Sequence, residues 1–288
     1  IDWRAPRDNS LIKERWNGFA INLAAFIHNS TDITILTIFT SLKIVSIYSV
    51  YNLVSSGIKQ LINACLTGIA HTVGQAYAKR NFDELNQKMD IYEYIVFVLV
   101  YFFFTVSALL ITPFVQIYTK GIVDTNYYQP VFGILLLISE ALYLIKLPHL
   151  NLAYSANKFK EITLPAFIEA TLNIVISILL VSKWGLIGVA VGTIAGMIYR
   201  MVFHVYYTSK IVPDRKQSKF YKKFLLFSVT AIIGFYLCYK CFPIVNVTVF
   251  NWIMHAIIYC VILGSIYGLI SFGFFKKELK FFIRYLKR

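Results

Sequence analysis

Charged residues are scarce in this chain. Asp, Glu, Lys and Arg make up 15% of its 288 residues, whereas soluble globular domains carry about 25%. Long polar stretches are missing too, so no soluble catalytic domain fits between the apolar runs. Instead, 58% of the residues are hydrophobic and the mean hydropathy is +0.65. Apolar runs of about 20 residues, long enough to cross a bilayer, recur along the chain. These features predict an all-α integral membrane protein.

Metal-ligand and catalytic motifs are absent as well. Of the cysteines Cys65, Cys238, Cys241 and Cys260, only Cys238 and Cys241 are close, and no second pair or histidine follows at metal-ligand spacing. We therefore expect free thiols and no metal site. The GxSxG, HExxH and Walker patterns do not occur. Their absence argues against a membrane enzyme, a bound cofactor and an ATP-driven pump acting alone.

The apolar runs predict about eight transmembrane helices. Their expected ranges are 15–39, 44–76, 91–113, 131–154, 162–182, 185–207, 223–242 and 251–273. The breaks between them are marked by Pro113, Gly121, Pro130, Gly185, Pro213 and Pro243. The chain begins with Ile1 rather than Met, and its first 15 residues are too polar for a signal peptide. We therefore expect a fragment that lacks an N-terminal part.

The basic residues indicate the orientation of the helices. The segments predicted to be cytoplasmic hold 21 of the 28 Lys and Arg residues, whereas the outer connections hold four. This asymmetry places both ends of the fragment in the cytoplasm. The net charge of +14 is confined largely to these loops, so it favours lipid headgroups over nucleic acid. The tail over 274–288 alternates apolar and basic residues at helical spacing, which predicts an amphipathic helix on the inner leaflet.

The first two predicted spans carry ionisable residues that are costly in hydrocarbon. His28, Asn29 and Asp32 occur together in the first span, with His28 and Asp32 on one helix face. Asp32 is a candidate proton or cation site; alternatively it caps a helix break. Lys59 lies near the middle of the second span and suits an anionic ligand. Its alternative role is an internal ion pair with Asp32 or Glu140.

The later spans add further polar residues. In the fourth span Pro148 predicts a kink, and Lys146 beside it is a second candidate for binding an anion. The alternative, a Lys146 that reaches the cytoplasm, is disfavoured because it lies about two turns from the helix end. Glu169 and Asn173 share one face of the fifth span and suit hydrogen bonds between helices. Arg200 lies near the inner end of the sixth span. We expect it either to contact a phosphate group or to anchor the helix end.

Glycines in the sixth span indicate close helix packing. Gly188, Gly192 and Gly196 follow one another at four-residue spacing in GLIGVAVGTIAGMIYR. Small residues at this spacing let a neighbouring helix approach closely. We therefore interpret this pattern as packing rather than function.

Three blocks carry a resemblance to a known family. They are NSTDITILTIFTSLKIVSIYSVYNLV, PFVQIYTKGIVDTNYYQP and KLPHLNLAYSANKFKEITLPAFIEATLNIVISILLVSKWGLIGVAVGT. They resemble the Wzx-type polysaccharide flippases, which share a superfamily with the multidrug and toxin extrusion (MATE) transporters and the lipid II flippases. The resemblance covers most of residues 12–215 and fades over the last two helices.

The resemblance implies the second lobe, with accessory helices, of a two-lobed, MATE-like flippase. The expected parts are a cytoplasmic linker (1–14), a six-helix lobe (15–207), a cytoplasmic loop (208–222), two accessory helices (223–273) and a basic tail (274–288). The implied activity is the movement of undecaprenyl-diphosphate-linked oligosaccharide across the bacterial cytoplasmic membrane by alternating access, for a capsule or exopolysaccharide. Polysaccharide polymerases and glycosyltransferases are possible partners besides membrane lipids.

The resemblance assigns roles to the intramembrane residues. Lys59, Lys146 and Arg200 would hold the diphosphate, and a proton or sodium gradient would couple through Asp32. The polar network would include Asn29, His28, Glu140, Glu169 and Asn173. A drug or cation antiporter of the same architecture is the main alternative, although two buried lysines fit it less well. A membrane glycosyltransferase or acyltransferase would need a larger outer loop than residues 114–130.

Overall fold

The structure, a computed structural model, describes residues 9–286, which form helices joined by loops. Its ten helices are α1 (Asn9–Phe39), α2 (Leu42–Ala78), α3 (Phe82–Tyr118), α4 (Pro130–Ile145), α5 (Leu147–Ser155), α6 (Phe159–Trp184), α7 (Leu186–Ile211), α8 (Gln217–Cys241), α9 (Val249–Phe274) and α10 (Lys276–Leu286). The all-α fold class is therefore confirmed. Of the predicted 1–14 linker, the first eight residues lie outside the described part, and the rest belong to α1.

Six segments are long and apolar enough to cross a membrane: α3, α4 with α5, α6, α7, α8 and α9. The chain is thus a multi-pass membrane protein. Helices α1 and α2 span 31 and 37 residues, so they too are long enough, but they are not among the six. Both contain the polar residues that a lipid-facing helix would exclude. This combination suits helices that line a polar interior.

The fourth span is broken in the membrane. Helix α4 ends at Ile145 and α5 begins at Leu147, with Lys146 between them and Pro148 in the first turn of α5. Proline has no N–H to donate to the preceding turn, which explains the break. Pro113, by contrast, does not end its helix as expected: α3 continues past it to Tyr118. Proline removes a single helical hydrogen bond there, and the remaining turn is retained.

Helices α6 and α7 form the closest pair in the bundle. A Cβ added to Gly188 would lie 2.6 Å from the backbone of Leu180, and one added to Gly196 would lie 2.9 Å from the carbonyl oxygen of Glu169. Gly192 allows the same approach between them, because a Cβ there would overlap the Ser177 hydroxyl. The predicted packing role of these glycines is confirmed.

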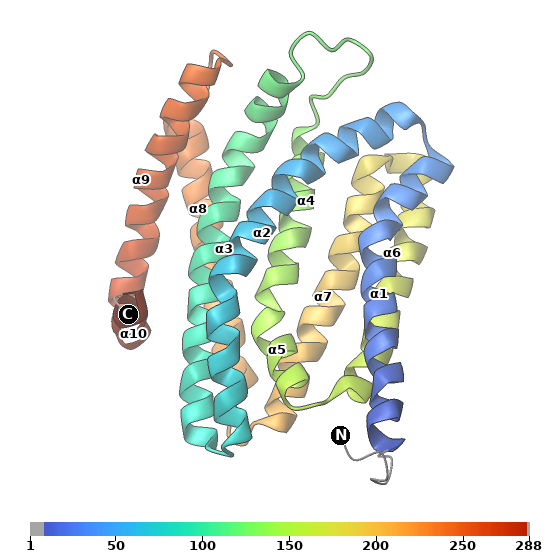
Figure 1. Cartoon of the computed structure of the whole chain (residues 1–288). Helices are drawn as coiled ribbons and strands as arrows, with labels where there is room; N and C mark the ends of the chain where they lie inside the picture. The colour runs from blue at the N-terminus through green and yellow to red at the C-terminus, as the bar shows by residue number, and fades with distance from the viewer. Residues whose placement is uncertain (1–8, 287–288) are drawn as a thin grey trace, which may run out of the picture.

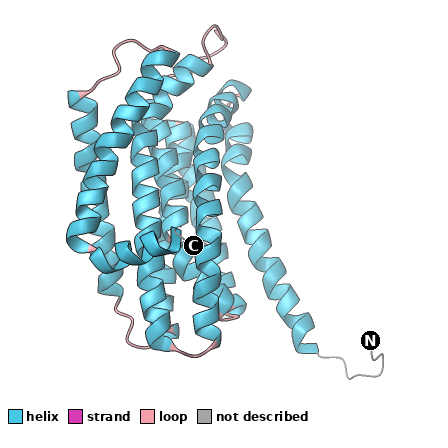
Figure 2. Ribbon diagram, turned by 60° about the vertical axis from the view of Figure 1, so that its left-hand side comes forward, coloured by secondary structure: helices cyan, strands magenta, loops and turns pink. Residues whose placement is uncertain are grey.

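This pair lies towards one side of a single bundle (Figure 1). Helix α1 packs on α6, and α7 lies between α4 and α6. At the opposite side, α8 and α9 pack on α3. Helix α10 turns sideways at the end of α9, as Figure 2 shows, and its Leu279 is half-buried against α3 and α9. The side chains beyond Phe281 lie outside the described part, so the apolar face of α10 is seen only at its start.

Candidate functional site

Eight of the nine polar residues singled out in the sequence line two adjoining cavities inside the bundle. The larger, here the Lys59 cavity, has a volume of about 150 Å³; the smaller, here the Arg200 cavity, has about 70 Å³. His28 and Asn29 line both. The Lys59 cavity adds Asp32, Lys59 and Glu140, and the Arg200 cavity adds Lys146, Glu169 and Arg200. The ninth residue, Asn173, is fully buried beside Asp32.

Glu169 is the centre of the Arg200 cavity. Its Oε2 accepts a hydrogen bond of 2.6 Å from Nη1 of Arg200, one helix away on α7. Its Oε1 lies 3.3 Å from Nδ1 of His28 and 3.8 Å from Nζ of Lys146. Arg200 also donates from Nε to Nε2 of His204, at 2.8 Å. All of these groups are buried or nearly so, and removing one partner of such a pair costs about 3–5 kcal/mol.

Lys146 owes its position to the break between α4 and α5. The residue is 3% exposed, so it does not reach out of the membrane as the alternative interpretation required. Its Nζ lies 3.3 Å from the Met197 sulfur and 4.6 Å from the centre of the Tyr143 ring. A cation over an aromatic face is attracted by the ring's negative surface. Lys146 is therefore held inside the bundle by the Met197 sulfur, by the Tyr143 ring and by Glu169.

Lys59 forms an ion pair with Glu140, one of the two partners considered in the sequence. Its Nζ lies 2.9 Å and 3.0 Å from the two carboxylate oxygens. The side chains keep 20% and 15% of their surface exposed to the Lys59 cavity. Lys59 thus has an internal counter-ion and at the same time remains accessible to a ligand.

Asp32 differs from the other two carboxylates because its partners are neutral. The Thr193 hydroxyl lies 2.9 Å from each of its oxygens, and the Asn173 amide lies 3.3 Å from Oδ1. Among the side chains that the structure describes, no cation is in ion-pair range of Asp32. More oxygens surround this point: the Ser177 hydroxyl is 2.9 Å from Asn173 Oδ1 and 3.3 Å from the carbonyl of Val189. The result is a compact group of oxygens from α1, α6 and α7.

Sequence reasoning missed Thr193 and Ser177 in this group. Both are buried hydroxyls, which seldom stand out among the many serines and threonines of a membrane protein. A signal was nevertheless present. Thr193 follows Gly192, so it lies next to the face on which α6 and α7 approach most closely.

A second charged cluster, here the Glu93 cluster, was also missed. Glu93 on α3 is 1% exposed and pairs with Arg215 and with Lys223, whose Nζ lies 3.1 Å away. Its third neighbour is His149 on α5, at 3.4 Å, and that ring bonds onward to Thr208 on α7 at 3.0 Å. The signal was a carboxylate three residues into the predicted span over 91–113. The cluster joins four helices at the end of the bundle that we expect to be cytoplasmic.

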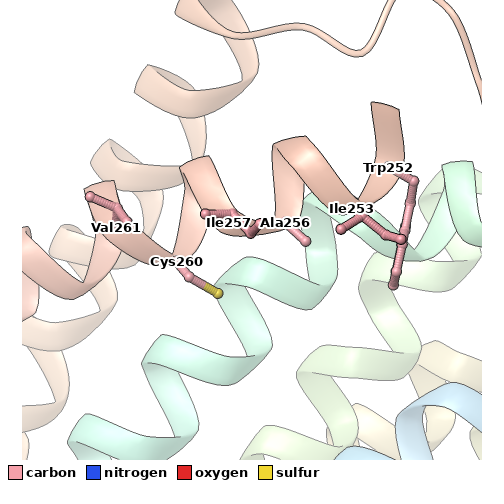
Figure 3. A pocket seen from close by; sticks show the side chains of 6 residues that line it. All are labelled: Trp252, Ile253, Ala256, Ile257, Cys260 and Val261. Carbon is pink, nitrogen blue, oxygen red and sulfur yellow. The ribbon is translucent and has the colours of Figure 1, made fainter. Parts of the chain in front are cut away.

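Other hollows in the bundle are apolar. A shallow hollow of about 400 Å³ on the face of α9 is lined by six residues from Trp252 to Val261, without a charged side chain (Figure 3). An apolar crevice of about 380 Å³ opens between α3, α4 and α8. Neither contains a charge that could select a polar ligand. The charged cavities are therefore the candidate functional site.

Comparison with known proteins supports the fold. No protein-family model matches the chain, and no curated protein matches its sequence. A solved structure described as "Lipid II flippase MurJ, inward closed conformation" aligns with it at a TM-score of 0.65 and 18% identity. This chain has a MurJ-like fold. The alignment covers 86% of this chain and 52% of MurJ, so the chain spans about half the length of MurJ.

The likeness to MurJ bears on architecture alone at this level of identity. MurJ is described as a lipid II flippase, so the fold occurs in a flippase. The fold agrees with the architecture that the resemblance in the sequence implied. The Wzx-type assignment and the cargo belong to the proposal below.

Proposed function

We propose that this chain forms the second lobe of a Wzx-type flippase. The parent protein would move undecaprenyl-diphosphate-linked oligosaccharide across the bacterial cytoplasmic membrane for capsule or exopolysaccharide synthesis. The flippase fold supports this proposal, as does the resemblance in the three sequence blocks. Since the chain spans half of MurJ, alternating access would require a further lobe to rock against this one.

The observation that carries the proposal is the convergence of three cations inside the bundle. Lys59, Lys146 and Arg200 line two adjoining cavities. Buried lysine and arginine are costly in a membrane and are kept where they serve a ligand or a path. A diphosphate carries several acceptor oxygens with negative charge, which suits two ammonium groups and one guanidinium. The candidate ligand is thus the diphosphate of the lipid carrier.

The oxygen group around Asp32 supplies a candidate site for the coupling ion. Asp32, Asn173, Thr193, Ser177 and the Val189 carbonyl are hard oxygen ligands, the type that alkali and alkaline-earth cations prefer. Asp32 also has the charge that a cation needs and no cationic partner among the described side chains. A sodium ion bound here would join α1 to α6 and α7. A proton on the Asp32 carboxylate would act at the same place.

The proposed organisation is the one expected from the sequence. The six spans over 15–207 would form the transport lobe, followed by a cytoplasmic loop over 208–222 and two accessory helices over 223–273. Both ends would face the cytoplasm, and the 274–288 tail would lie on the inner leaflet. We propose no enzymatic activity and no nucleic-acid partner. Polysaccharide polymerases and glycosyltransferases remain proposed partners beside the lipid-linked glycan.

One observation favours a second candidate function, a cation-coupled drug antiporter. Such a transporter needs a carboxylate that can hold a cation, and Asp32 meets that requirement. The antiporter, however, gives no reason for Lys146 and Arg200 to be buried in the cavity wall. The flippase explains both the cations and Asp32.

Complementation tests the proposal. Cells without their own polysaccharide flippase receive the intact gene with wild-type, Lys59→Gln or Lys240→Gln codons, together with the enzymes for its glycan. Lys240 is exposed at the end of α8, so its variant is a matched control. We expect outer-leaflet lipid-linked glycan with the wild type and the control, and a loss with Lys59→Gln. If well-expressed wild-type protein yields none, the antiporter becomes the better candidate.

A further inference from the structure

The two charged cavities are balanced in charge. Their described walls hold three cations, Lys59, Lys146 and Arg200, and three carboxylates, Asp32, Glu140 and Glu169. A diphosphate that enters therefore meets cations that already have counter-ions. It also brings an excess of negative charge into a region shielded from water, where uncompensated charge is unfavourable. Positive charge has to enter with the ligand, or a carboxylate has to lose its charge.

The two ion pairs differ in how easily they can be opened. Glu169 is held by Arg200, Lys146 and His28 together, and its side chain is 5% exposed. Among the described side chains, Glu140 is held by Lys59 alone, and its side chain is 15% exposed, facing the larger cavity. Opening the Glu140 pair leaves one cation free to bind the ligand in its place. Opening the Glu169 group would disturb three partners at once.

We propose that Glu140 is the exchangeable counter-ion of the site. A phosphate oxygen of the ligand replaces the Glu140 carboxylate on Lys59, and the freed carboxylate takes one proton from a buffer acid in the surrounding solution, which is left as its conjugate base. Lys59 stays protonated throughout, so one ionic contact is exchanged for another and one O–H bond forms on Glu140. When the ligand leaves, Glu140 releases the proton and pairs with Lys59 again. This inference rests on the proposed function, because it requires a phosphate ligand.

Once Lys59 has moved to the ligand, the described groups around Glu140 offer it no second counter-ion. Asp32 and His28 line the same cavity from α1, and the ligand phosphate would add negative charge beside them. Like charges nearby disfavour an ionised carboxylate. The other cations, Lys146 between α4 and α5 and Arg200 on α7, are engaged with Glu169 on α6. Tyr143 on α4 offers a ring to Lys59 at 4.9 Å but no charge. With Lys59 transferred to phosphate, no other cation among the described side chains is in ion-pair range of Glu140.

Calorimetry of ligand binding tests the inference. The intact protein in detergent is titrated with farnesyl diphosphate at neutral pH, in buffers that differ in ionisation enthalpy. The slope of the observed enthalpy against ionisation enthalpy gives the number of protons taken up. We expect about one proton per ligand for the wild type. Glu140→Gln should bind with no uptake, and its affinity should exceed that of the wild type increasingly as the pH rises.

A matched control variant and a measurement of binding at varied sodium distinguish the possible outcomes. Glu161→Gln removes an exposed carboxylate paired with Lys158 outside the cavities and should keep the wild-type uptake. Uptake that persists in Glu140→Gln overturns the inference. The inference is also overturned if the wild type binds the ligand without proton uptake and binds it more tightly as sodium is added. In that case the compensating positive charge is a sodium ion that enters near Asp32. If farnesyl diphosphate binds to none of the folded proteins, the proposed diphosphate site fails first, and the inference falls with it.

Discussion

Arg200 on α7 and Glu169 on α6 form the shortest ion pair of the candidate site, with Nη1 and Oε2 2.6 Å apart. The pair lies at the level where Gly196 brings the two helix backbones together. The close approach at Gly196 thus packs the two helices together and places Arg200 beside Glu169. Two helices that approach this closely fix the guanidinium in one position, where it also orients His204.

Removing one member of this pair should destabilise the protein strongly. Glu169→Gln leaves Arg200 without its carboxylate, and we expect a loss of about 3–5 kcal/mol in unfolding free energy. Arg200→Met, which leaves Glu169 with Lys146 and His28, should cost less than Glu169→Gln. The combined variant should lose less than the sum of both single losses. Thermal unfolding in detergent, followed by tryptophan fluorescence, measures all three.

The control is the Lys158–Glu161 pair, whose side chains are 41% and 39% exposed. Lys158→Gln should change the unfolding free energy by about 0.2–1 kcal/mol at most. Equal effects of Lys158→Gln and Glu169→Gln would show that the buried pair is not the stabilising contact described here.

Gly192 should tolerate no larger residue. A Cβ at this position overlaps the Ser177 hydroxyl and lies 2.9 Å from the Asn173 carbonyl oxygen. We expect Gly192→Ala to cost about 1–3 kcal/mol and Gly192→Leu to lower the membrane yield further. Gly57→Ala in α2 is the matched control, since no atom lies within 4 Å of an added Cβ there. It should be neutral or stabilise by about 0.5–1 kcal/mol.

The oxygen group at Asp32 should govern any dependence on sodium. Thr193→Val removes one ligand oxygen at nearly constant shape and should raise the sodium concentration needed for half-maximal transport about tenfold. Asp32→Asn should abolish the dependence. Thr193→Ser keeps the hydroxyl and should behave as the wild type. Flipping by reconstituted protein at varied sodium and constant ionic strength measures this, and an unchanged sodium curve in Asp32→Asn would refute the site.

The spans could be predicted from the sequence because hydrocarbon imposes a length and a composition on each one. The glycine face of α7 followed in the same way from its spacing, and the ion pair between Lys59 and Glu140 was among the alternatives considered. Individual charges inside apolar runs are conspicuous, so the candidate residues were found one at a time. The contacts between these candidate residues, however, depend on which helices are neighbours in the bundle.

That neighbourhood could not be derived from the sequence. Glu169 and Arg200 are 31 residues apart, and Asp32 and Thr193 are 161 apart. No local spacing connects such positions. The end of α3 also escaped prediction, because Pro113 was interpreted as a stop, whereas it weakens one turn and the packed helix continues. Local rules predicted the elements, and tertiary contacts decided the pairs.

Glu93 supplies a last test, because its cluster holds the loop before α8. Arg215 is bound there to Glu93, Asp90 and Asn86, and its side chain is 7% exposed. Trypsin should therefore cleave after Arg215 slowly in the folded protein, whereas the next residue, Lys216, is exposed and cleavable. Glu93→Gln removes the most buried partner of Arg215. We expect cleavage after Arg215 to rise about tenfold relative to cleavage after Lys216, as read by mass spectrometry of timed digests.

The control for this experiment is Lys219→Gln, which alters an exposed neighbour whose Nζ lies 3.5 Å from Asp90. It should leave the ratio of the two cleavages unchanged. A ratio in Glu93→Gln equal to that of the wild type would mean that the loop is held by Asp90 and Asn86 alone. In that case the role of Glu93 is to pair with Lys223 on α8 and His149 on α5. It then joins α3 to these helices but does not hold the loop between α7 and α8 in place.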